Sequence, residues 1–373
     1  MSIKYIFWDD DSGYGISARQ LIKYLLNNGI KVSAVGIKRS HRYQKGYKIV
    51  QNITAKTDYD IVFIHSSPYY LKYFIEPGKI NIVYCTWETT RLPEKWVTEI
   101  NRCSAVFVPS QFNKECFERS GVTRPTYLLP HISEFMGLSA AQVPSEKIQS
   151  PFTFYSIGMW TNRKNNLALI DAFSQTFQNG ENVRLIIKTS KKDYTEPAIR
   201  LFKKSGYVYH RNLLSTAKIK KALKNDPRIK LITREWPSSQ IADLHVAGDC
   251  YISLSKSEGW GMGPYEAAWF GKPIVITGFG GQLDFLPKDL ALLLPYELKL
   301  INDPVWTDYM TEAQEWAEIT VGAAEKAMKE IYTNQLKFKD KGIALKQSVA
   351  SRFNVSDILK SFIYDLNTTC EGK

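Results

Sequence analysis

The stretch SKSEGWGMGPYEAAWFGKPIVIT, residues 255–277, is the most informative part of the chain. An apolar run that is typical of a strand leads into Glu258, and three glycines follow: Gly259, Gly261 and Gly263. Pro264 suits the first turn of a helix, where the missing N–H of proline costs nothing. The free amides and the positive dipole end of such a helix favour phosphate. The stretch therefore predicts a strand, a glycine-rich turn and a helix that form an anion site.

Two carboxylates flank this predicted site, Glu258 in the turn and Glu266 in the first turns of the helix. Carboxylates are poor ligands for a phosphate, but they accept hydrogen bonds from sugar hydroxyls. The spacing thus suits a sugar joined to a diphosphate. A plain glycine-rich turn, with Glu266 complementing the helix dipole, is the alternative that this stretch alone leaves open.

Outward from this stretch, short apolar runs alternate with helical patterns along the chain, which indicates a parallel α/β architecture. Strands are expected at 3–8, 31–37, 60–66, 80–87, 105–110, 125–130, 152–158, 183–190, 229–236, 250–257 and 272–278, and helices at 16–29, 111–121, 163–180 and 238–248. Residues 311–368 are expected to be mostly helical. The polar, proline-bearing segment 137–151 is interpreted as a linker. The pattern predicts two doubly wound domains with a cleft between them.

The composition agrees with two domains, because 373 residues with 44% hydrophobic content exceed one ordinary core. No apolar run approaches the ~20 residues of a membrane span, and the N-terminus does not resemble a signal peptide. Five scattered cysteines without a CxxC pair indicate reduced thiols in a cytoplasmic protein and argue against structural zinc. No metal site is expected.

Positive charge is concentrated in two stretches of a chain whose net charge is +12. Residues 191–230 hold twelve Lys and Arg against three acids, a net +9, and residues 36–48 interleave Lys and Arg with tyrosines. Such clusters attract nucleic acid, acidic lipid headgroups or phosphorylated glycans. A solvated, Lys-rich face is the alternative.

The motif EGWGMGPYE, followed by AAWFGKPIV, resembles the signature of retaining GT-B glycosyltransferases of glycosyltransferase family 4. Further stretches resemble that family in the same order: SGYGISAR (12–19), TWETTRLPEKW (86–96), VPSQFNKECF (108–117), LLPHIS (128–133), GMWTNRKNNLALIDAF (158–173) and LIIKTS (185–190). The resemblance implies two Rossmann-like domains that face each other across a cleft. They are an acceptor domain at 1–140, to which a C-terminal helix at about 354–373 returns, and a donor domain at 150–350.

By the same resemblance, Glu266 holds the nucleotide ribose and Glu258 the transferred sugar. The backbone of Gly259, Trp260, Gly261, Met262 and Gly263 lies against the diphosphate. Lys164 falls where the family has its phosphate-binding lysine, whereas Met159 replaces the usual arginine. Arg163 or Lys188 is expected to supply the missing cation, although Arg163 also fits an ordinary first-turn helix residue.

The N-terminal half departs from the family where a histidine usually lies near the reacting sugar, because Trp87 and Glu88 occupy that position. Glu88 is expected to orient the sugar or acceptor, or Trp87 to stack against one. His131 is a further candidate, and His65 a weaker one.

The stretch IFWDDDSGYGIS, residues 6–17, fits a metal-binding acidic cluster, a phosphatase-type Asp-x-Asp pair or a glycine turn near a phosphate. The resemblance favours the turn, with Gly13 and Gly15 near the donor and Asp11 near an acceptor hydroxyl. A Rossmann-type oxidoreductase is disfavoured because Ala18 replaces the third glycine of GxGxxG.

The resulting hypothesis is a metal-independent hexosyltransferase that needs no cofactor. It moves a sugar from a nucleotide-diphosphate donor to an acceptor hydroxyl with retention of configuration. Because the basic stretch at 36–48 lies in the acceptor domain, the expected acceptor is a cell-surface or lipid-linked glycan, anionic or membrane-associated. The enzyme is then cytoplasmic and peripheral at the inner membrane face. Transfer to modified DNA, or non-catalytic binding of a nucleotide sugar, are the alternatives.

Overall fold

The computed structural model describes residues 1–10, 12–39, 47–52, 58–137, 150–178, 180–197, 199–203, 206–210, 223, 226–305, 309 and 313–371. The chain divides into two compact units, Met1–Met136 with Phe353–Lys373, and Gly137–Arg352. Asp11 lies outside the described residues, as do most of the expected linker at 137–151 and much of both basic stretches.

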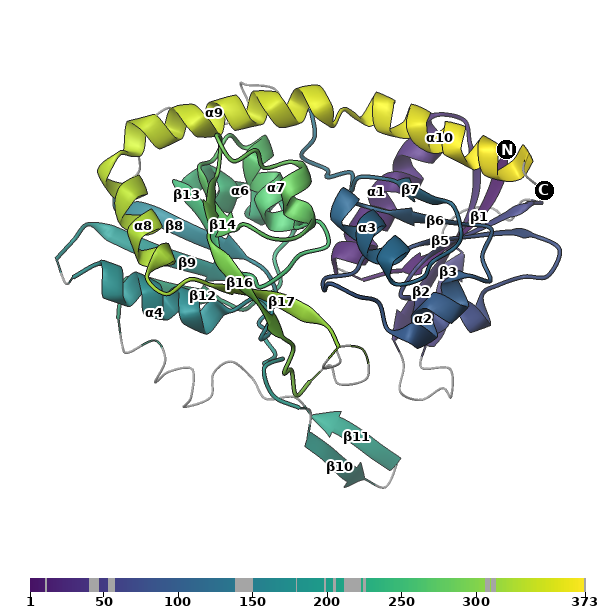
Figure 1. Cartoon of the computed structure of the whole chain (residues 1–373), viewed down its shortest axis with the longest axis horizontal. Coiled ribbons are helices and arrows are strands. Elements are labelled where there is room, and N and C mark those ends of the chain that lie inside the picture. The colour runs from purple at the N-terminus through teal and green to yellow at the C-terminus, as the bar shows by residue number, and fades with distance from the viewer. Residues whose placement is uncertain are drawn as a thin grey trace. The chain divides into compact units, whose positions relative to one another are not determined.

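The first unit contains a seven-stranded sheet in the order β3-β2-β1-β4-β5-β6-β7 (Figure 1). Its strands are β1 (Ser2–Trp8), β2 (Lys31–Arg39), β3 (Tyr47–Asn52), β4 (Ile61–His65), β5 (Ile80–Tyr84), β6 (Ala105–Val108) and β7 (Thr126–Leu128). All neighbours pair in parallel except β2 and β3. The sequence IVFIH of β4 is buried throughout, as expected for a parallel strand covered on both faces.

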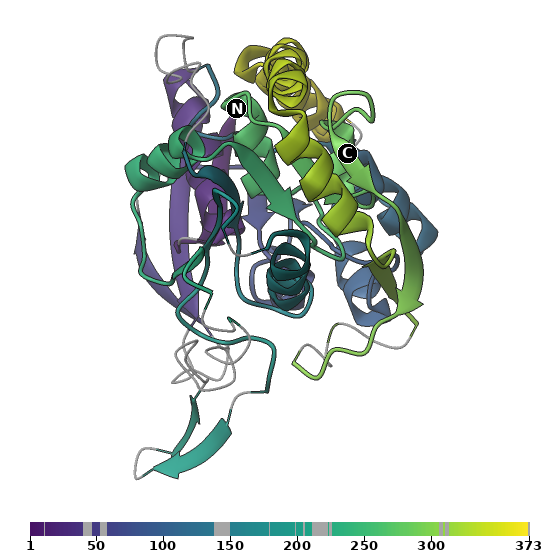
Figure 2. The same cartoon turned by 90° about the vertical axis from the view of Figure 1, so that its left-hand side faces the viewer.

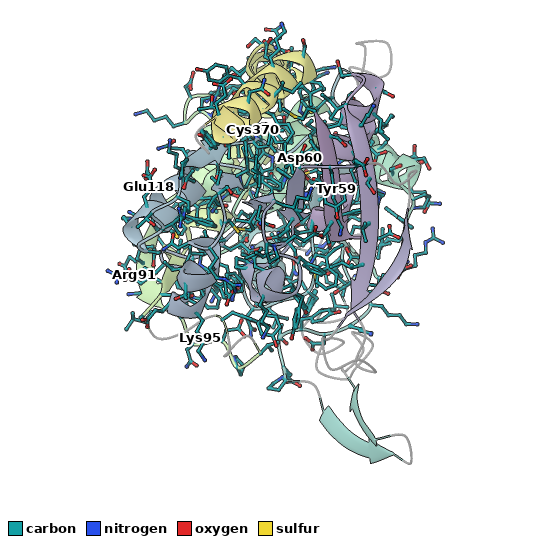
Figure 3. The ribbon with its side chains drawn as sticks, turned by 90° about the vertical axis from the view of Figure 1, so that its right-hand side faces the viewer. Tyr59, Asp60, Arg91, Lys95, Glu118 and Cys370 are labelled. Carbon is teal, nitrogen blue, oxygen red and sulfur yellow. The ribbon has the colours of Figure 1, made fainter. Side chains whose placement is uncertain are left out.

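The helical elements of this unit are α1 (Gly13–Asn27), η1 (Pro68–Tyr73), α2 (Glu94–Ile100), α3 (Gln111–Arg119) and α10 (Val355–Glu371). The C-terminal α10 packs on this unit, since the ring of Phe362 lies 5.4 Å from that of Phe63 and 5.1 Å from that of Phe107. The prediction of a C-terminal helix that returns to the first domain is therefore confirmed. All five cysteines are free, and Cys370 on α10 is the partly exposed one (Figure 3).

The second unit contains a parallel six-stranded sheet in the order β12-β9-β8-β13-β14-β15. The strands are β8 (Phe152–Ile157), β9 (Val183–Lys188), β12 (Ile229–Ile232), β13 (Cys250–Ser253), β14 (Ile274–Thr277) and β15 (Leu292–Leu294). Its helical elements are α4 (Asn166–Thr176), α6 (Ser238–Ala247), α7 (Met262–Trp269), η3 (Gly281–Asp284), α8 (Ala323–Thr333) and α9 (Gln335–Arg352). Both units are doubly wound and Rossmann-like, so the predicted fold class is confirmed.

Several elements differ from the sequence-based expectation. The hairpins β10–β11 (Ile199–Lys203 and Gly206–His210) and β16–β17 (Tyr296–Leu300 and Glu315–Ile319) were not anticipated, and β17 lies where helix was expected. The hairpin β10–β11 extends away from the sheet of its unit (Figures 1 and 2). Strands β10 and β11 lie in the stretch interpreted as a basic segment, and β16 is exposed throughout, so it lacks the apolar run of a buried strand. None of the described helices is long and apolar enough to cross a membrane.

Candidate functional site

The candidate site lies where the strand order of the second sheet reverses, between β8 and β13. In open α/β sheets, ligands bind at such a switch point, outside the carboxyl ends of the strands. Two loops leave the sheet here, at 158–165 and 254–261. They are joined where the backbone N–H of Lys256 donates to the carbonyl of Arg163 at 2.7 Å. The fold thus brings together segments almost one hundred residues apart.

Glu258 is the centre of this junction. Its carboxylate oxygen Oε1 accepts a hydrogen bond from the Lys164 ammonium, and Oε2 accepts one from Arg163 Nη1 at 3.0 Å. Glu258 is only 6% exposed. A carboxylate this deeply buried is costly unless it is paired and hydrogen-bonded, and here two cations satisfy it. The structure therefore joins three of the four residues predicted as catalytic.

The charge state of Glu258 follows from these partners. Burial acts to raise its pKa, but Lys164 and Arg163 outweigh burial and lower the pKa to about 2. At neutral pH the side chain is therefore ionised and can only accept hydrogen bonds. Such a group positions hydroxyls or cations, and it has no proton to donate.

Glycines near Glu258 allow backbone conformations and close contacts that a larger side chain would prevent. Gly261 has a φ of 91° and forms the N-cap of α7, a left-handed conformation that favours glycine. A Cβ on Gly263 would lie 2.5 Å from the hydroxyl of Tyr251, so only glycine lets α7 approach β13 this closely. A Cβ on Gly280 would lie 2.6 Å from the carbonyl oxygen of Glu258. Packing therefore accounts for glycine at these positions, and the contact of the turn with the diphosphate stays a prediction.

Two details of this turn agree with the expectation. The helix begins at Met262, so Pro264 is its third residue and lies in its first turn. Trp260, like Gly259 a predicted donor contact through its backbone, directs its side chain into the core, 1% exposed and 5.0 Å from the ring of Phe285. Any contact of Trp260 with a donor must come from its main chain.

Glu266 lies on α7 and is 8% exposed, and no sequence motif predicted its contact with His245. Nε2 of His245 lies 3.6 Å from the Glu266 carboxylate, and Nδ1 of the same ring is 2.9 Å from the hydroxyl of Tyr155. The His245 ring stacks on Phe270 at 4.9 Å. Burial lowers the pKa of His245, although Glu266 acts to raise it. A lone histidine in a helical pattern carries no motif that would have revealed this role.

Lys188, the remaining predicted cation, ends β9 next to β8, where its carbonyl accepts from Gly158 N at 3.0 Å. Burial lowers the pKa of its ammonium, and Glu235 acts in the opposite direction. Within the described residues, Lys188 makes no ion pair with Glu258. Arg163 fills the expected place better, because α4 starts only at Asn166 and leaves Arg163 in the loop.

In the first unit, Gly13 and Gly15 form the first turn of α1 and not a separate turn, which corrects the prediction. A Cβ on Gly15 would lie 2.0 Å from the carbonyl oxygen of Asp10, so this glycine is required for packing. Asp10 accepts a hydrogen bond from the N–H of Ser12 at 3.0 Å. The side chain of Asp10 thus shapes the start of α1.

His65 and His131 of the first unit belong to a buried network. Nδ1 of His131 lies 2.6 Å from Ser17 Oγ and 2.8 Å from the hydroxyl of Tyr84, while Nδ1 of His65 lies 2.7 Å from that of Tyr5. Burial lowers the pKa of His131 to about 3 and that of His65 well below its usual value. Both imidazoles are therefore neutral at physiological pH, and their hydrogen bonds support the core.

Trp87 does not present a face for stacking on a sugar, contrary to one expectation. It is 3% exposed, and its indole N–H donates to Thr89 Oγ1 and to the carbonyl of Arg91, both at 2.6 Å. The neighbouring Glu88 is partly exposed and stays a candidate for contact with sugar or acceptor. Sequence alone could not separate the two, because both suit the end of a strand.

Comparisons with known proteins agree with this architecture. Residues 140–289, less than half of the chain, match the family described as "Glycosyl transferases group 1". A search of the curated proteins found no match.

Solved structures of low sequence identity share the fold over most or all of this chain. A sucrose-phosphate synthase from Thermosynechococcus elongatus has a TM-score of 0.68 and 14% identity, with 100% of both chains covered. A UDP-forming α,α-trehalose-phosphate synthase from Burkholderia xenovorans has a TM-score of 0.62 and 13% identity over 99% of this chain and 100% of that chain. S. aureus TarM, in a complex that contains UDP, has a TM-score of 0.58 and 11% identity over 82% and 54%. Residues 140–289 thus match the glycosyl transferases group 1 family, and the chain has the GT-B fold.

Proposed function

We propose that this protein is a retaining glycosyltransferase that moves a sugar from a nucleotide-diphosphate donor to an acceptor hydroxyl. One observation carries the proposal: Glu258 is ionised between Lys164 and Arg163 at the switch point of the second sheet, just before the glycine-rich start of α7. All of these residues fall within the matched range 140–289, and this supports the assignment.

The charges suggest how the leaving group is stabilised. The diphosphate competes with Glu258 for the ammonium of Lys164 and the guanidinium of Arg163. Together with the free amides at the start of α7, these cations stabilise the negative charge that develops as the sugar–phosphate bond breaks. In this account the nucleotide sugar is the substrate, and no cofactor or metal takes part.

The carboxylates take positioning roles in this proposal. Glu258, whose pKa is about 2, accepts a hydrogen bond from the donor sugar, and Glu266 accepts one from the ribose. Because the account assigns no carboxylate as a nucleophile, the acceptor attacks on the face that the diphosphate leaves. The departing phosphate oxygen takes the acceptor's proton, and configuration is retained.

The proposed acceptor is a cell-surface or lipid-linked glycan, and the proposed location is the cytoplasmic face of the membrane. Support comes from charge: the basic, tyrosine-bearing stretch 36–48 favours an anionic partner. Residues 40–46 of this stretch lie outside the described residues. Binding to vesicles with and without anionic lipid, at low and high salt, tests this part.

The enzymatic proposal is tested with purified full-length protein and a panel of UDP-, GDP- and ADP-linked hexoses. Release of the nucleoside diphosphate is measured for the wild type, Glu258→Ala and a control, Glu297→Ala, whose side chain is 72% exposed on β16. We expect release by the wild type and the control, and its loss in Glu258→Ala. If no donor is bound or turned over, or if Glu258→Ala is as active as the wild type, the proposal fails.

A further inference from the structure

A cavity lies beside the candidate site in the same unit. It has a volume of about 300 Å³, at the lower end of the range typical for small-molecule sites. Its lining includes Asn162, Asn165, Asn166, Asn302 and Trp316. The cavity is polar for a site of this size, since amide and hydroxyl side chains dominate the lining.

The cavity and the candidate site share one backbone wall. The loop at 158–165 directs Arg163 and Lys164 to Glu258, whereas Asn162 and Asn165 of the same loop line the cavity. Lys256, which also lines it, lies two positions before Glu258. A ligand in the cavity would therefore contact the same loop that carries Arg163 and Lys164.

The hairpin β16–β17 completes the cavity. Trp316 of β17 and Asn302, in the connection after β16, belong to its lining. The backbone N–H of Ala317 donates to the carbonyl of Lys256 at 2.9 Å, and the Lys256 ammonium pairs with Glu318. This hairpin was not anticipated from the sequence, and it is anchored on the loop that carries Glu258.

The asparagines retain unused hydrogen-bonding groups. Asn162 and Asn166 donate through Nδ2 to the carbonyls of Thr195 and Met159, at 3.2 and 3.3 Å. Their carboxamide oxygens have no hydrogen bond within the described part of the chain, and Asn166 is only 6% exposed. The carboxamide of Asn165 has no partner at all among the described residues. Asn162 and Asn165 are only half-buried, so these oxygens and amides are open to solvent and available to hydrogen-bond a ligand.

The backbone of Asn165 supports the same conclusion. Its φ of 52° is the one positive value among the described residues other than glycine. Such a conformation is uncommon outside glycine, although asparagine adopts it more readily than other residues, and it recurs at ligand sites. At Asn165 it begins α4, yet the side chain caps no helix N–H.

The charges select the class of occupant. Among the described lining residues only Lys256 is charged, and it is already paired with Glu318 and lies 4.5 Å from the centre of the Trp316 ring. The described lining of the cavity therefore offers no unpaired cation to an anionic ligand. Carboxamides both donate and accept hydrogen bonds, as sugar hydroxyls do, so the lining suits a neutral, hydroxyl-rich molecule.

We propose that this cavity is a saccharide subsite that binds a neutral sugar residue of the glycan acceptor. The inference rests on the proposed function, because it gives the acceptor a second point of attachment beside the donor site. Asn165 and Asn302 are the specificity-determining residues, and the β16–β17 hairpin is the element that provides the outer wall.

The test uses saturation-transfer NMR titration of full-length protein with three disaccharides: maltose, cellobiose and N,N′-diacetylchitobiose. Asn165→Gly removes the carboxamide but tolerates the positive φ, and Asn302→Ala alters an exposed position. Asn182→Ala, exposed and not in the lining, is the matched control. We expect at least one disaccharide to bind, with affinity about tenfold lower in Asn165→Gly and Asn302→Ala and unchanged in the control.

Thermal unfolding of each variant confirms that it is folded. If none of the three disaccharides binds to the wild type, or if both lining variants bind as tightly as the control, the subsite does not exist. Nucleoside diphosphate release, measured on the same wild-type preparation, reports the proposed function separately. Donor hydrolysis without saccharide binding refutes the subsite alone, whereas asparagine-dependent saccharide binding without donor hydrolysis refutes the transferase proposal alone.

Discussion

Replacement of Glu258 by glutamine keeps the shape of the side chain but removes its charge. In the wild type, this charge offsets those of Lys164 and Arg163, whose side chains are only 19% and 15% exposed. The Glu258→Gln variant removes the counter-charge that Glu258 provides to both buried cations. Removing one partner of a buried pair is strongly destabilising for this reason.

The lowered pKa of Glu258 gives the size of the expected loss in the free energy of unfolding. Lowering it from the ordinary value of 4.5 to about 2 stabilises the folded state, since each pKa unit corresponds to about 1.4 kcal/mol. The carboxylate thus contributes about 3 kcal/mol to the free energy of unfolding at neutral pH. Because the folded pKa is the lower one, this contribution is complete above pH 4.5 and is lost as the pH falls through 2.

Urea unfolding, followed by tryptophan fluorescence and circular dichroism, measures the difference at several pH values. We expect Glu258→Gln to be less stable by about 3 kcal/mol at pH 7, with a difference that shrinks progressively below pH 4.5. Glu297→Gln, at an exposed position, is the control. Equal stability of the wild type and Glu258→Gln at pH 7, or a difference that is independent of pH down to 3, would refute the reasoning.

Three further substitutions test the candidate site, the packing of α7 and the buried His131. Lys164→Ala should lower donor turnover about a hundredfold, because it removes a cation that stabilises the leaving diphosphate. Steady-state kinetics measure the turnover, and a rate equal to that of the wild type would contradict the prediction. Gly263→Ala should destabilise the fold by about 1–3 kcal/mol, since its Cβ would lie 2.5 Å from the Tyr251 hydroxyl; Gly13→Ala, which meets no atom within 4 Å, is the control for thermal unfolding. For His131, whose pKa burial lowers to about 3, the stabilising contribution is complete above pH 6.5 and declines as the pH falls toward 3. Replacing it with Asn should therefore flatten that decline in the unfolding midpoint, and an equally steep decline contradicts the assignment.

Much of the fold could be predicted because the parallel strands are continuous apolar runs. The segments FTFYSI of β8 and IVFIH of β4 are buried along almost their whole length, and glycines close several helices. The strands that were missed are β3, β10, β11, β15, β16 and β17. Strand β15 has only three residues and β16 is exposed along its whole length, so neither shows the apolar run of a buried parallel strand.

The candidate site could be predicted only in part. The resemblance located Glu258, Lys164 and Arg163, and the structure joins them in one ion-paired cluster. It could not show that the Trp87 indole is committed to the core, because burial of an aromatic side chain at a strand end depends on tertiary packing. For the same reason, the contact between His245 and Glu266 and the asparagine-lined cavity became visible only in the folded chain.

The central claim is that the site around Glu258 transfers a sugar from a nucleotide donor with retention. Proton NMR of the anomeric signals, recorded while full-length protein acts on the nucleotide sugar that it turns over, tests this most directly. We expect the anomeric signal of the donor to decline and a product of the same anomeric configuration to appear. When Glu258→Ala replaces the wild type, we expect the donor signal to stay constant. A product of inverted configuration, or equal turnover by Glu258→Ala, would contradict it.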